Sequence, residues 1–175
     1  ELQEQQWMYL NGVILVSPTE IGIDRNGPVD AANDLPYFTA TAWYHRKLPE
    51  NLQEKDLDEI LPEVEAYTLH KLIPALAKGG FISIKEKEAV AKQMANYSGL
   101  SKQTILDHNL AVPASFFWKE LLRSEGHTVG RLDSRYKGID RKNAGISPDY
   151  NSELTSWLHS FTPAVNYYYK NVLSF

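Results

Sequence analysis

The side chains able to carry out chemistry are scattered along this chain. The five histidines are too widely spaced for an H-x-x-x-H metal pair, and surface or capping positions are expected for them. The sequence contains no G-x-S-x-G nucleophile turn and no glycine-rich phosphate loop. Glu63 and Glu65 fall on the polar side of an amphipathic helix and are expected to be solvated. Spacing alone therefore predicts no catalytic residue, no metal site and no cofactor.

Ser17 ends the most apolar short run of the chain. Residues 13–16 are four large apolar residues between Gly12 and Pro18, which favours a strand buried on both faces. Such strands are typical of parallel sheets that are covered by helices. Ser17 lacks the flanking glycines of a strained nucleophile turn. The rest of the sequence shows almost no further strands that could form a parallel sheet with this one. We therefore expect the chain to be part of a larger protein that supplies the other strands.

The rest of the chain has mainly helical periodicity, so we predict a mainly α fold. Prolines at 62, 74 and 163 are expected to kink or break their helices. Asp34, Ser83, Ser101 and Ser115 are the predicted N-terminal caps. A short extended run is expected near 129–136. The predicted helices cover residues 35–47, 55–78, 84–97, 101–109, 116–123 and 152–173.

Composition narrows the possible classes of protein. The chain has 175 residues, 43% of them apolar, and ten Tyr, six Phe and four Trp, which indicates a packed globular protein. A net charge of −4 without a basic stripe argues against a nucleic-acid partner. No apolar run reaches the roughly 20 residues of a membrane span. The chain has no cysteine, which excludes disulfides and thiolate metal sites but leaves the cellular compartment open.

One charged run stands out between two glycines. Residues 130–140, Gly-Arg-Leu-Asp-Ser-Arg-Tyr-Lys-Gly-Ile-Asp, alternate opposite charges. The simplest interpretation is a turn-rich surface ribbon whose i, i+2 charge pairs contribute little to stability.

This run is also part of a wider resemblance. Residues 126–140 resemble bacterial members of the serine carboxypeptidase family (carboxypeptidase Y-like). The other resembling runs occur in the same order as in the family and together span nearly the whole chain. They are Asn11–Pro18, Asn33–Tyr37, Ala40–His45, Gly99–Ser101 and Asn109–Leu110.

The resemblance implies an α/β-hydrolase with a helical lid inserted after the strand that follows the nucleophile helix. Residues 1–18 would be a remnant of the hydrolase core, 19–33 a connecting loop, and 34–175 the lid. The family's triad serine would precede residue 1, and its aspartate and histidine would follow residue 175. No catalytic residue is therefore assigned to this chain. In eukaryotic relatives disulfides cross-link the lid, whereas a lid without cysteine must depend on apolar packing for its stability.

The resemblance also implies a substrate pocket near the start of the lid. Ser17 would face the site because ligands lie beyond the carboxyl ends of parallel strands. Tyr37 and Phe38 correspond to aromatic residues that shape the pocket for the residue preceding the scissile bond, and Asn33 and Asp34 lie beside them. The alternative, that both aromatics belong to the lid core, stays open.

The expected function is that of a lid on a hydrolase that removes C-terminal residues from peptides, with a peptide as substrate. Two alternatives remain. One is a helical module that binds a peptide or partner helix in an aromatic groove, and the other is an acyltransferase of the same family. Only the resemblance suggests a periplasmic or secreted location. The strand at 12–18 is expected to pair with its copy in a homodimer or with residues 129–136.

Overall fold

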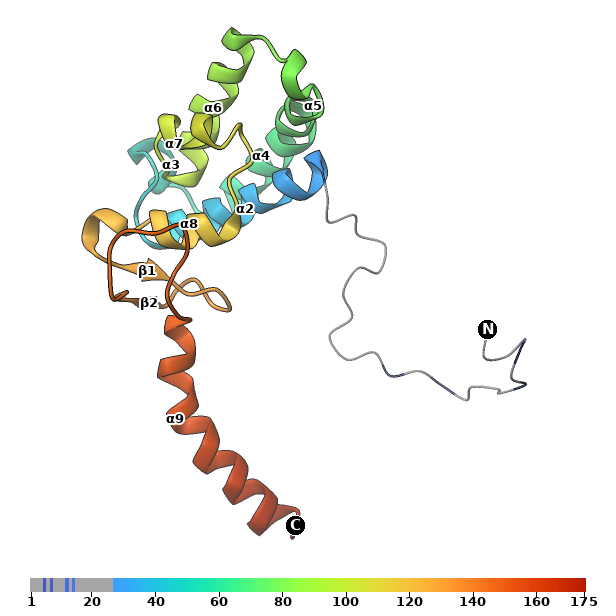
Figure 1. Cartoon of the computed structure of the whole chain (residues 1–175), viewed down its shortest axis with the longest axis vertical. Coiled ribbons are helices and arrows are strands. Elements are labelled where there is room, and N and C mark those ends of the chain that lie inside the picture. Colours follow the sequence, from blue (N-terminus) through green and yellow to red (C-terminus); the bar gives the residue numbers. More distant parts are fainter. Residues whose placement is uncertain (1–4, 6, 8–11, 13, 15–26) are drawn as a thin grey trace.

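A computed structural model describes residues 27–175 together with residues 5, 7, 12 and 14 (Figure 1). The predicted strand at 12–18, including Ser17, lies outside the described residues except for Gly12 and Ile14. The structure therefore does not describe whether this strand pairs with its copy in a second chain or with residues 129–136.

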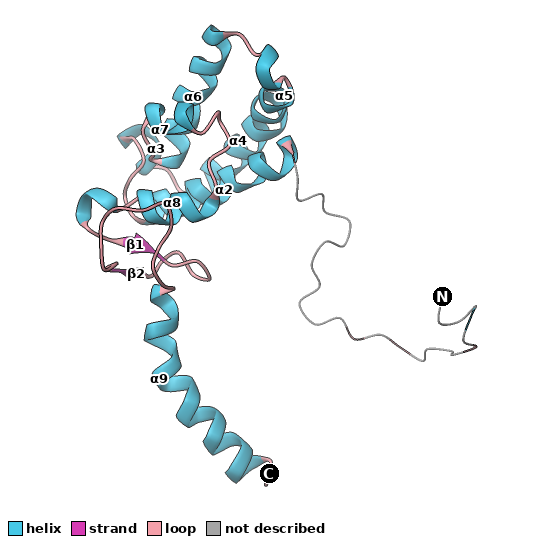
Figure 2. Ribbon diagram, in the orientation of Figure 1, coloured by secondary structure: helices cyan, strands magenta, loops and turns pink. Residues whose placement is uncertain are grey.

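The described chain is mainly helical, which confirms the predicted fold class (Figure 2). Besides the α-helices it contains two short 3-10 helices, two π-helical turns and one pair of strands. The α-helices are α2 (Pro28–Tyr44), α3 (Glu50–Gln53), α4 (Leu57–Tyr67), α5 (Ile73–Ala77), α6 (Ile84–Ser98), α7 (Lys102–Asp107), α8 (Ala114–Glu120) and α9 (Ser152–Tyr167). The π turns are Thr68–Leu72 and Tyr168–Val172, the 3-10 helices are Gly79–Phe81 and Arg123–Glu125, and the strands are β1 (Thr128–Val129) and β2 (Lys137–Gly138).

Helix α2 is the central element of the fold. It contacts α4, α5 and α6, and its inward face is buried. The helix begins at Pro28, a favourable first position, so Asp34 lies inside it and the predicted cap at Asp34 is wrong. Ala32 is fully buried about one turn before Leu35. Burial of this apolar face lets the helix begin earlier than residue 35, the start that the sequence predicts from Pro36. Local proline preference is overridden by burial of the apolar face.

The positions of three prolines explain why the helices continue where breaks or kinks are predicted. Pro62 lies within α4 and Pro163 within α9, so the predicted break at Pro163 is wrong. Pro74 is the second residue of α5, which follows the π turn Thr68–Leu72, and a missing N–H costs little in the first turn of a helix. All three prolines are exposed, which lets water solvate the carbonyl that each one leaves without a donor.

The predicted helix caps agree with the structure at two positions. Ser83 Oγ accepts a hydrogen bond from the backbone N of Glu86 at 3.2 Å, and Ser101 Oγ accepts one from the backbone N of Thr104 at 3.0 Å. Gly99 ends α6 with a φ of 69°, the left-handed conformation that favours glycine. Helix α8 already begins at Ala114, so the predicted cap at Ser115 is wrong.

The hydrophobic core lies between α2 and the helices around it. Phe38 of α2 stacks on Phe117 of α8 with ring centroids 4.0 Å apart and an interplanar angle of 11°. The largest buried apolar side chains come from helices and turns between residues 35 and 122. They include Leu35, Phe38, Ile60, Leu72, Ile105, Leu110, Phe117 and Leu122. Apolar packing thus joins the two ends of the helical body.

The extended run predicted at 129–136 is much shorter than expected. Strand β1 pairs antiparallel with β2, with Thr128 opposite Gly138 and Val129 opposite Lys137. Residues 130–136 form the connecting loop, which closes through a 2.9 Å hydrogen bond from the backbone N of Gly130 to the carbonyl of Tyr136. None of the described helices has both the length and the apolar character needed to cross a membrane.

Two tyrosines between α4 and α6 make stability sensitive to alkaline pH. Their rings meet edge to face at 5.4 Å, and the Tyr97 hydroxyl donates to Glu63 Oε1 at 2.7 Å. Burial, together with this hydrogen bond, raises the pKa of Tyr97 to about 12, and burial also raises the pKa of Tyr67. The folded state therefore favours the neutral phenols.

We expect the free energy of unfolding to fall as the pH rises from about 10, the ordinary tyrosine pKa, to about 12. The unfolded chain loses these protons first, so the stabilisation is complete below pH 10 and disappears above the folded-state pKa. Urea unfolding across this range should give a shallower pH dependence for Tyr97→Phe than for Tyr167→Phe, in which the replaced ring is exposed. Identical pH profiles for the two variants would contradict this prediction.

Candidate functional site

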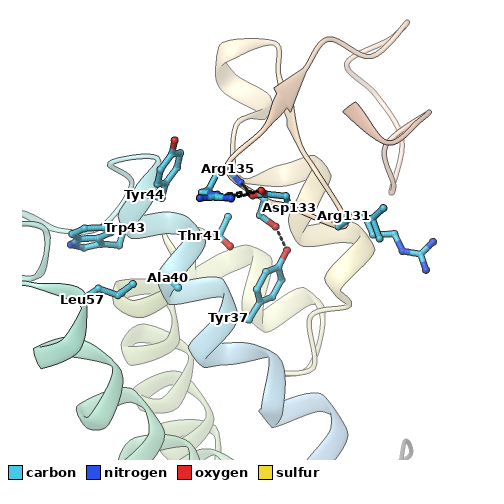
Figure 3. Close-up of a pocket in the computed structure, with 11 residues that line it drawn as sticks. Tyr37, Ala40, Thr41, Trp43, Tyr44, Leu57, Arg131, Asp133 and Arg135 are labelled. Carbon is cyan, nitrogen blue, oxygen red and sulfur yellow. Dashed lines mark hydrogen bonds and ion pairs between the residues drawn. The ribbon is translucent and has the colours of Figure 1, made fainter. Parts of the chain in front are cut away.

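A cavity lined by several aromatic side chains lies between α2 and the loop 131–135 (Figure 3). Its volume is about 490 Å³. One wall comes from α2, the other from the loop, and α4 contributes one side chain. The lining residues are Tyr37, Ala40, Thr41, Trp43, Tyr44, Leu57, Arg131, Leu132, Asp133, Ser134 and Arg135.

The α2 wall is built from helical spacing. Tyr37, Thr41 and Tyr44 lie at i, i+4 and i+7, so one stripe of the helix faces the cavity. Trp43 is fixed beside them, because its Nε1 donates to the carbonyl of Lys55 at 3.0 Å and its carbonyl accepts from Gln53 Nε2 at 3.0 Å. A wall of three aromatic rings is suited to an apolar or aromatic side chain.

A directed chain of hydrogen bonds joins this wall to the loop. Trp118 Nε1 donates to the Tyr37 hydroxyl at 2.7 Å, and the Tyr37 hydroxyl also bonds Ser134 Oγ. Ser134 Oγ in turn donates to the carbonyl of Gly130 at 2.9 Å, so Tyr37 must be the donor to Ser134. The Tyr37 hydroxyl is therefore engaged in holding the loop, which leaves the side of the ring to line the cavity.

His45 holds the same loop from the end of α2. Its Nε2 lies 2.7 Å from the carbonyl oxygen of Ser134 and must be the donor, because a carbonyl can only accept. Its ring meets Tyr44 edge to face at 5.1 Å. His45 thus has a positioning role.

The charged residues of the loop form a pair within the cavity wall. Arg135 Nη2 lies 2.6 Å from Asp133 Oδ2, which confirms an i, i+2 pair in this run. This hydrogen bond lowers the pKa of Asp133 and raises the pKa of Arg135, so both groups stay charged at neutral pH. Figure 3 shows Arg131 turned away from the other labelled side chains.

Glu153, in the first turn of α9, anchors the loop from the opposite side. Its side chain is fully buried, and its Oε1 accepts from the backbone N of Leu132 at 2.6 Å. Its Oε2 has no hydrogen-bond partner among the described residues. A Cβ on Gly130 would lie 2.5 Å from this oxygen and 2.4 Å from the carbonyl of Asp133. Only glycine leaves space for this close packing.

The structure separates the residues that the sequence had grouped as pocket candidates. Tyr37 lines the cavity, whereas Phe38 is 3% exposed and belongs to the core. Asn33 is exposed and Asp34 half-buried, and neither lines the cavity. Burial and the charge of Asp30 raise the pKa of Asp34. Ser17 lies outside the described residues.

Sequence reasoning missed Trp43, Tyr44 and the whole loop wall. The i, i+4, i+7 spacing of Tyr37, Thr41 and Tyr44 was a usable signal for the α2 stripe. The run 130–140 stands out in the sequence by its alternating charges, but nothing in its residue types shows that it lies against α2. Among the described residues, no group of three His, Cys, Asp or Glu side chains is arranged to hold a metal ion.

Comparisons of the chain with protein-family models, curated proteins and solved structures gave no significant match. The function must therefore be argued from the residues and the geometry of the cavity.

Replacing Ser134 by alanine should lower the free energy of unfolding by about 1–3 kcal/mol, because Tyr37 and Gly130 then lose their partner in a half-buried site. Denaturant unfolding measures the change, and Ser124→Ala, at an exposed position, serves as the matched control with an effect near zero. Equal losses for the two variants would argue against a hydrogen-bond chain that holds the loop.

Proposed function

We propose that this chain acts as the helical lid of a serine carboxypeptidase-like hydrolase, and that its cavity receives an apolar side chain of a peptide substrate. One observation carries the proposal. Two runs that resemble this family, Ala40–His45 and Gly126–Asp140, lie far apart in the sequence but contribute the opposite walls of the same cavity.

The chemistry of the walls supports a peptide with a bulky apolar residue. Tyr37, Trp43 and Tyr44 offer ring surfaces, while Asp133 and Arg135 neutralise each other. A substrate side chain in the cavity would displace water and bury apolar area, at about 25 cal/mol per Å². Closing such a lid over the reacting groups also strengthens the electrostatic interactions inside.

In the proposed hydrolase, the chemistry is acyl transfer to a serine and then to water, as the resemblance implies. By the resemblance, the nucleophile and the base lie outside this chain, and the oxyanion hole lies largely outside it. The part of this chain is to bind and orient the side chain that precedes the scissile bond. The hydrogen-bond chain from Trp118 to Gly130 gives that cavity a fixed wall, which favours selectivity.

The proposal is tested with the complete open reading frame that encodes this chain. Its product should release the C-terminal amino acid from N-blocked dipeptides and be labelled at one serine by a phosphonate, and that serine should lie outside residues 1–175. Transfer of the acyl group to an added alcohol in preference to water would assign the site to an acyltransferase. Labelling of a serine within 1–175, or no labelling and no hydrolysis, would overturn the proposal.

In that enzyme, Tyr37→Ala should lower kcat/KM more for substrates with a bulky apolar residue before the scissile bond than for those with alanine there. The difference should be about 1–3 kcal/mol, the usual value of one set of pocket contacts. Tyr37→Phe keeps the ring and loses only the hydroxyl, so it should preserve the preference while lowering the melting temperature. Equal losses of kcat/KM for both substrates in Tyr37→Ala would favour a purely structural role.

A further inference from the structure

Helix α9 carries an apolar stripe that no described residue covers. Among the described residues, its contacts to the body come from its first turns, through the Glu153 carboxylate and an edge-to-face contact of Trp157 with Tyr136 at 5.5 Å. Helix α9 runs away from the other helices (Figure 1). Phe161 is 58% exposed, although it lies in the middle of a helix.

The stripe has the spacing of a helix-pairing seam. We define the seam as the apolar residues that recur at alternating intervals of four and three along α9 and the π turn that follows it. They are Leu154, Leu158, Phe161, Val165, Tyr168 and Val172. This 3-4 alternation is the pattern that packs knobs into the holes of a second helix with the same repeat.

Charge favours a second copy of the same helix as the partner. From Leu154 to Val172 the only formally charged side chain is that of Lys170, which lies on the face opposite the seam. The seam is flanked instead by uncharged side chains such as Thr162, whose hydroxyl bonds the Leu158 carbonyl of its own helix at 3.1 Å. Two copies can therefore approach without like-charge repulsion, and an acidic or basic partner would gain nothing from this face.

The apolar area exposed on and beside the seam is close to the area that a stable pair buries. A fully buried aromatic side chain covers about 150–250 Å², so the half-exposed residues of the seam and its flank offer on the order of 100 Å² each. Phe175 and Tyr169 extend the exposed apolar surface beside the seam. The total approaches the roughly 800 Å² per partner that is typical of stable complexes.

Pro163 lies on the face opposite the seam and is exposed. A proline leaves the carbonyl four residues earlier, here that of His159, without a backbone donor. Because this carbonyl lies on the proline side of the helix, the unpaired polar group is kept away from the seam.

We propose that the chain forms a homodimer in which the seam of α9 packs against the seam of a second copy. This interface differs from the pairing expected at residues 12–18, and it does not depend on the proposed lid function. The pair buries the apolar stripe that a single described chain leaves in contact with water. Because the seam lies outside the core cluster, substitutions in it should leave the fold of the body intact.

The test is the molar mass of the full 175-residue chain by light scattering and sedimentation over a range of concentrations. The expected result is a dimer that Phe161→Glu converts to a monomer, since each copy would then have to bury a carboxylate in the apolar seam. The matched control is Ser160→Glu, one residue away but off the seam, which should remain a dimer. Circular dichroism of both variants should match that of the parent chain.

A second measurement uses the absence of cysteine. Phe161→Cys and Val165→Cys place single thiols in the seam, and mild oxidation should link two chains in at least one of these variants, whereas Ser160→Cys stays largely unlinked. A monomer at every concentration overturns the proposal, as does a dimer that Phe161→Glu leaves unchanged. Sedimentation of a monomeric chain with phosphatidylcholine vesicles would assign the stripe to a lipid surface and overturn it as well.

Discussion

Replacing Lys119 by alanine is expected to lower the free energy of unfolding by about 3–5 kcal/mol, a loss large enough to unfold many small domains. The Lys119 side chain is 2% exposed and that of its partner Asp140 is 4% exposed. Its Nζ also donates to the carbonyl of Lys142 at 2.8 Å. Removing the ammonium group leaves a buried carboxylate without its cation, and this uncompensated charge is the main cost.

Urea unfolding followed by circular dichroism measures this loss. Lys78→Ala breaks a surface pair with Glu86 and should cost less than about 1 kcal/mol, so it is the matched control. The double substitution Lys119→Met/Asp140→Leu removes both charges and should recover most of the loss. A loss below 1 kcal/mol for Lys119→Ala would show that the pair does not hold the 139–149 loop to α8.

Replacing Phe117 by alanine should lower the free energy of unfolding by a similar amount, about 3–5 kcal/mol. Its ring is fully buried, stacks on Phe38 at 4.0 Å and meets Tyr37 edge to face at 6.1 Å. The substitution opens a cavity where α2 and α8 meet, directly behind the aromatic wall of the candidate pocket. The neighbouring rings can refill this space only in part.

Phe81→Ala removes the same group from a position that is 97% exposed and should change stability by less than about 0.5 kcal/mol. Thermal and chemical unfolding give the change in the free energy of unfolding for both variants. The difference between the two changes is the effect of burial, because both variants lose the same phenyl ring. Similar small effects for both would mean that the α2–α8 contact contributes little to the fold.

The contrast between neighbouring aromatics shows where sequence reasoning reached its limit. Tyr37 and Phe38 are adjacent, and the sequence predicts one shared role for both, in the pocket or in the lid core, yet one lines the cavity and the other fills the core. Successive residues of a helix point about 100° apart, so adjacent side chains rarely share a face. The sequence could place both on a helix, but only packing against α8 determined which of them faces inward.

The helices themselves were largely readable from the sequence because their determinants are local. Ser83 and Ser101 cap helices through hydrogen bonds to residues three positions later, and Gly99 ends α6 with a positive φ. Proline gave less reliable information. Pro36, Pro62 and Pro163 all lie inside helices, since burial of an apolar face or solvation of a freed carbonyl offsets one missing hydrogen bond.

What the sequence by itself determined is the mainly helical class, the positions of most helices, the lack of disulfides and the charged run at 130–140. Only the tertiary structure decided that this run forms a wall against α2, that Ser134 bonds Tyr37, and that Lys119 and Glu153 are buried. The reason is physical. Caps and helical periodicity depend on residues within a turn or two, whereas a cavity depends on side chains whose meeting is fixed by how whole helices pack.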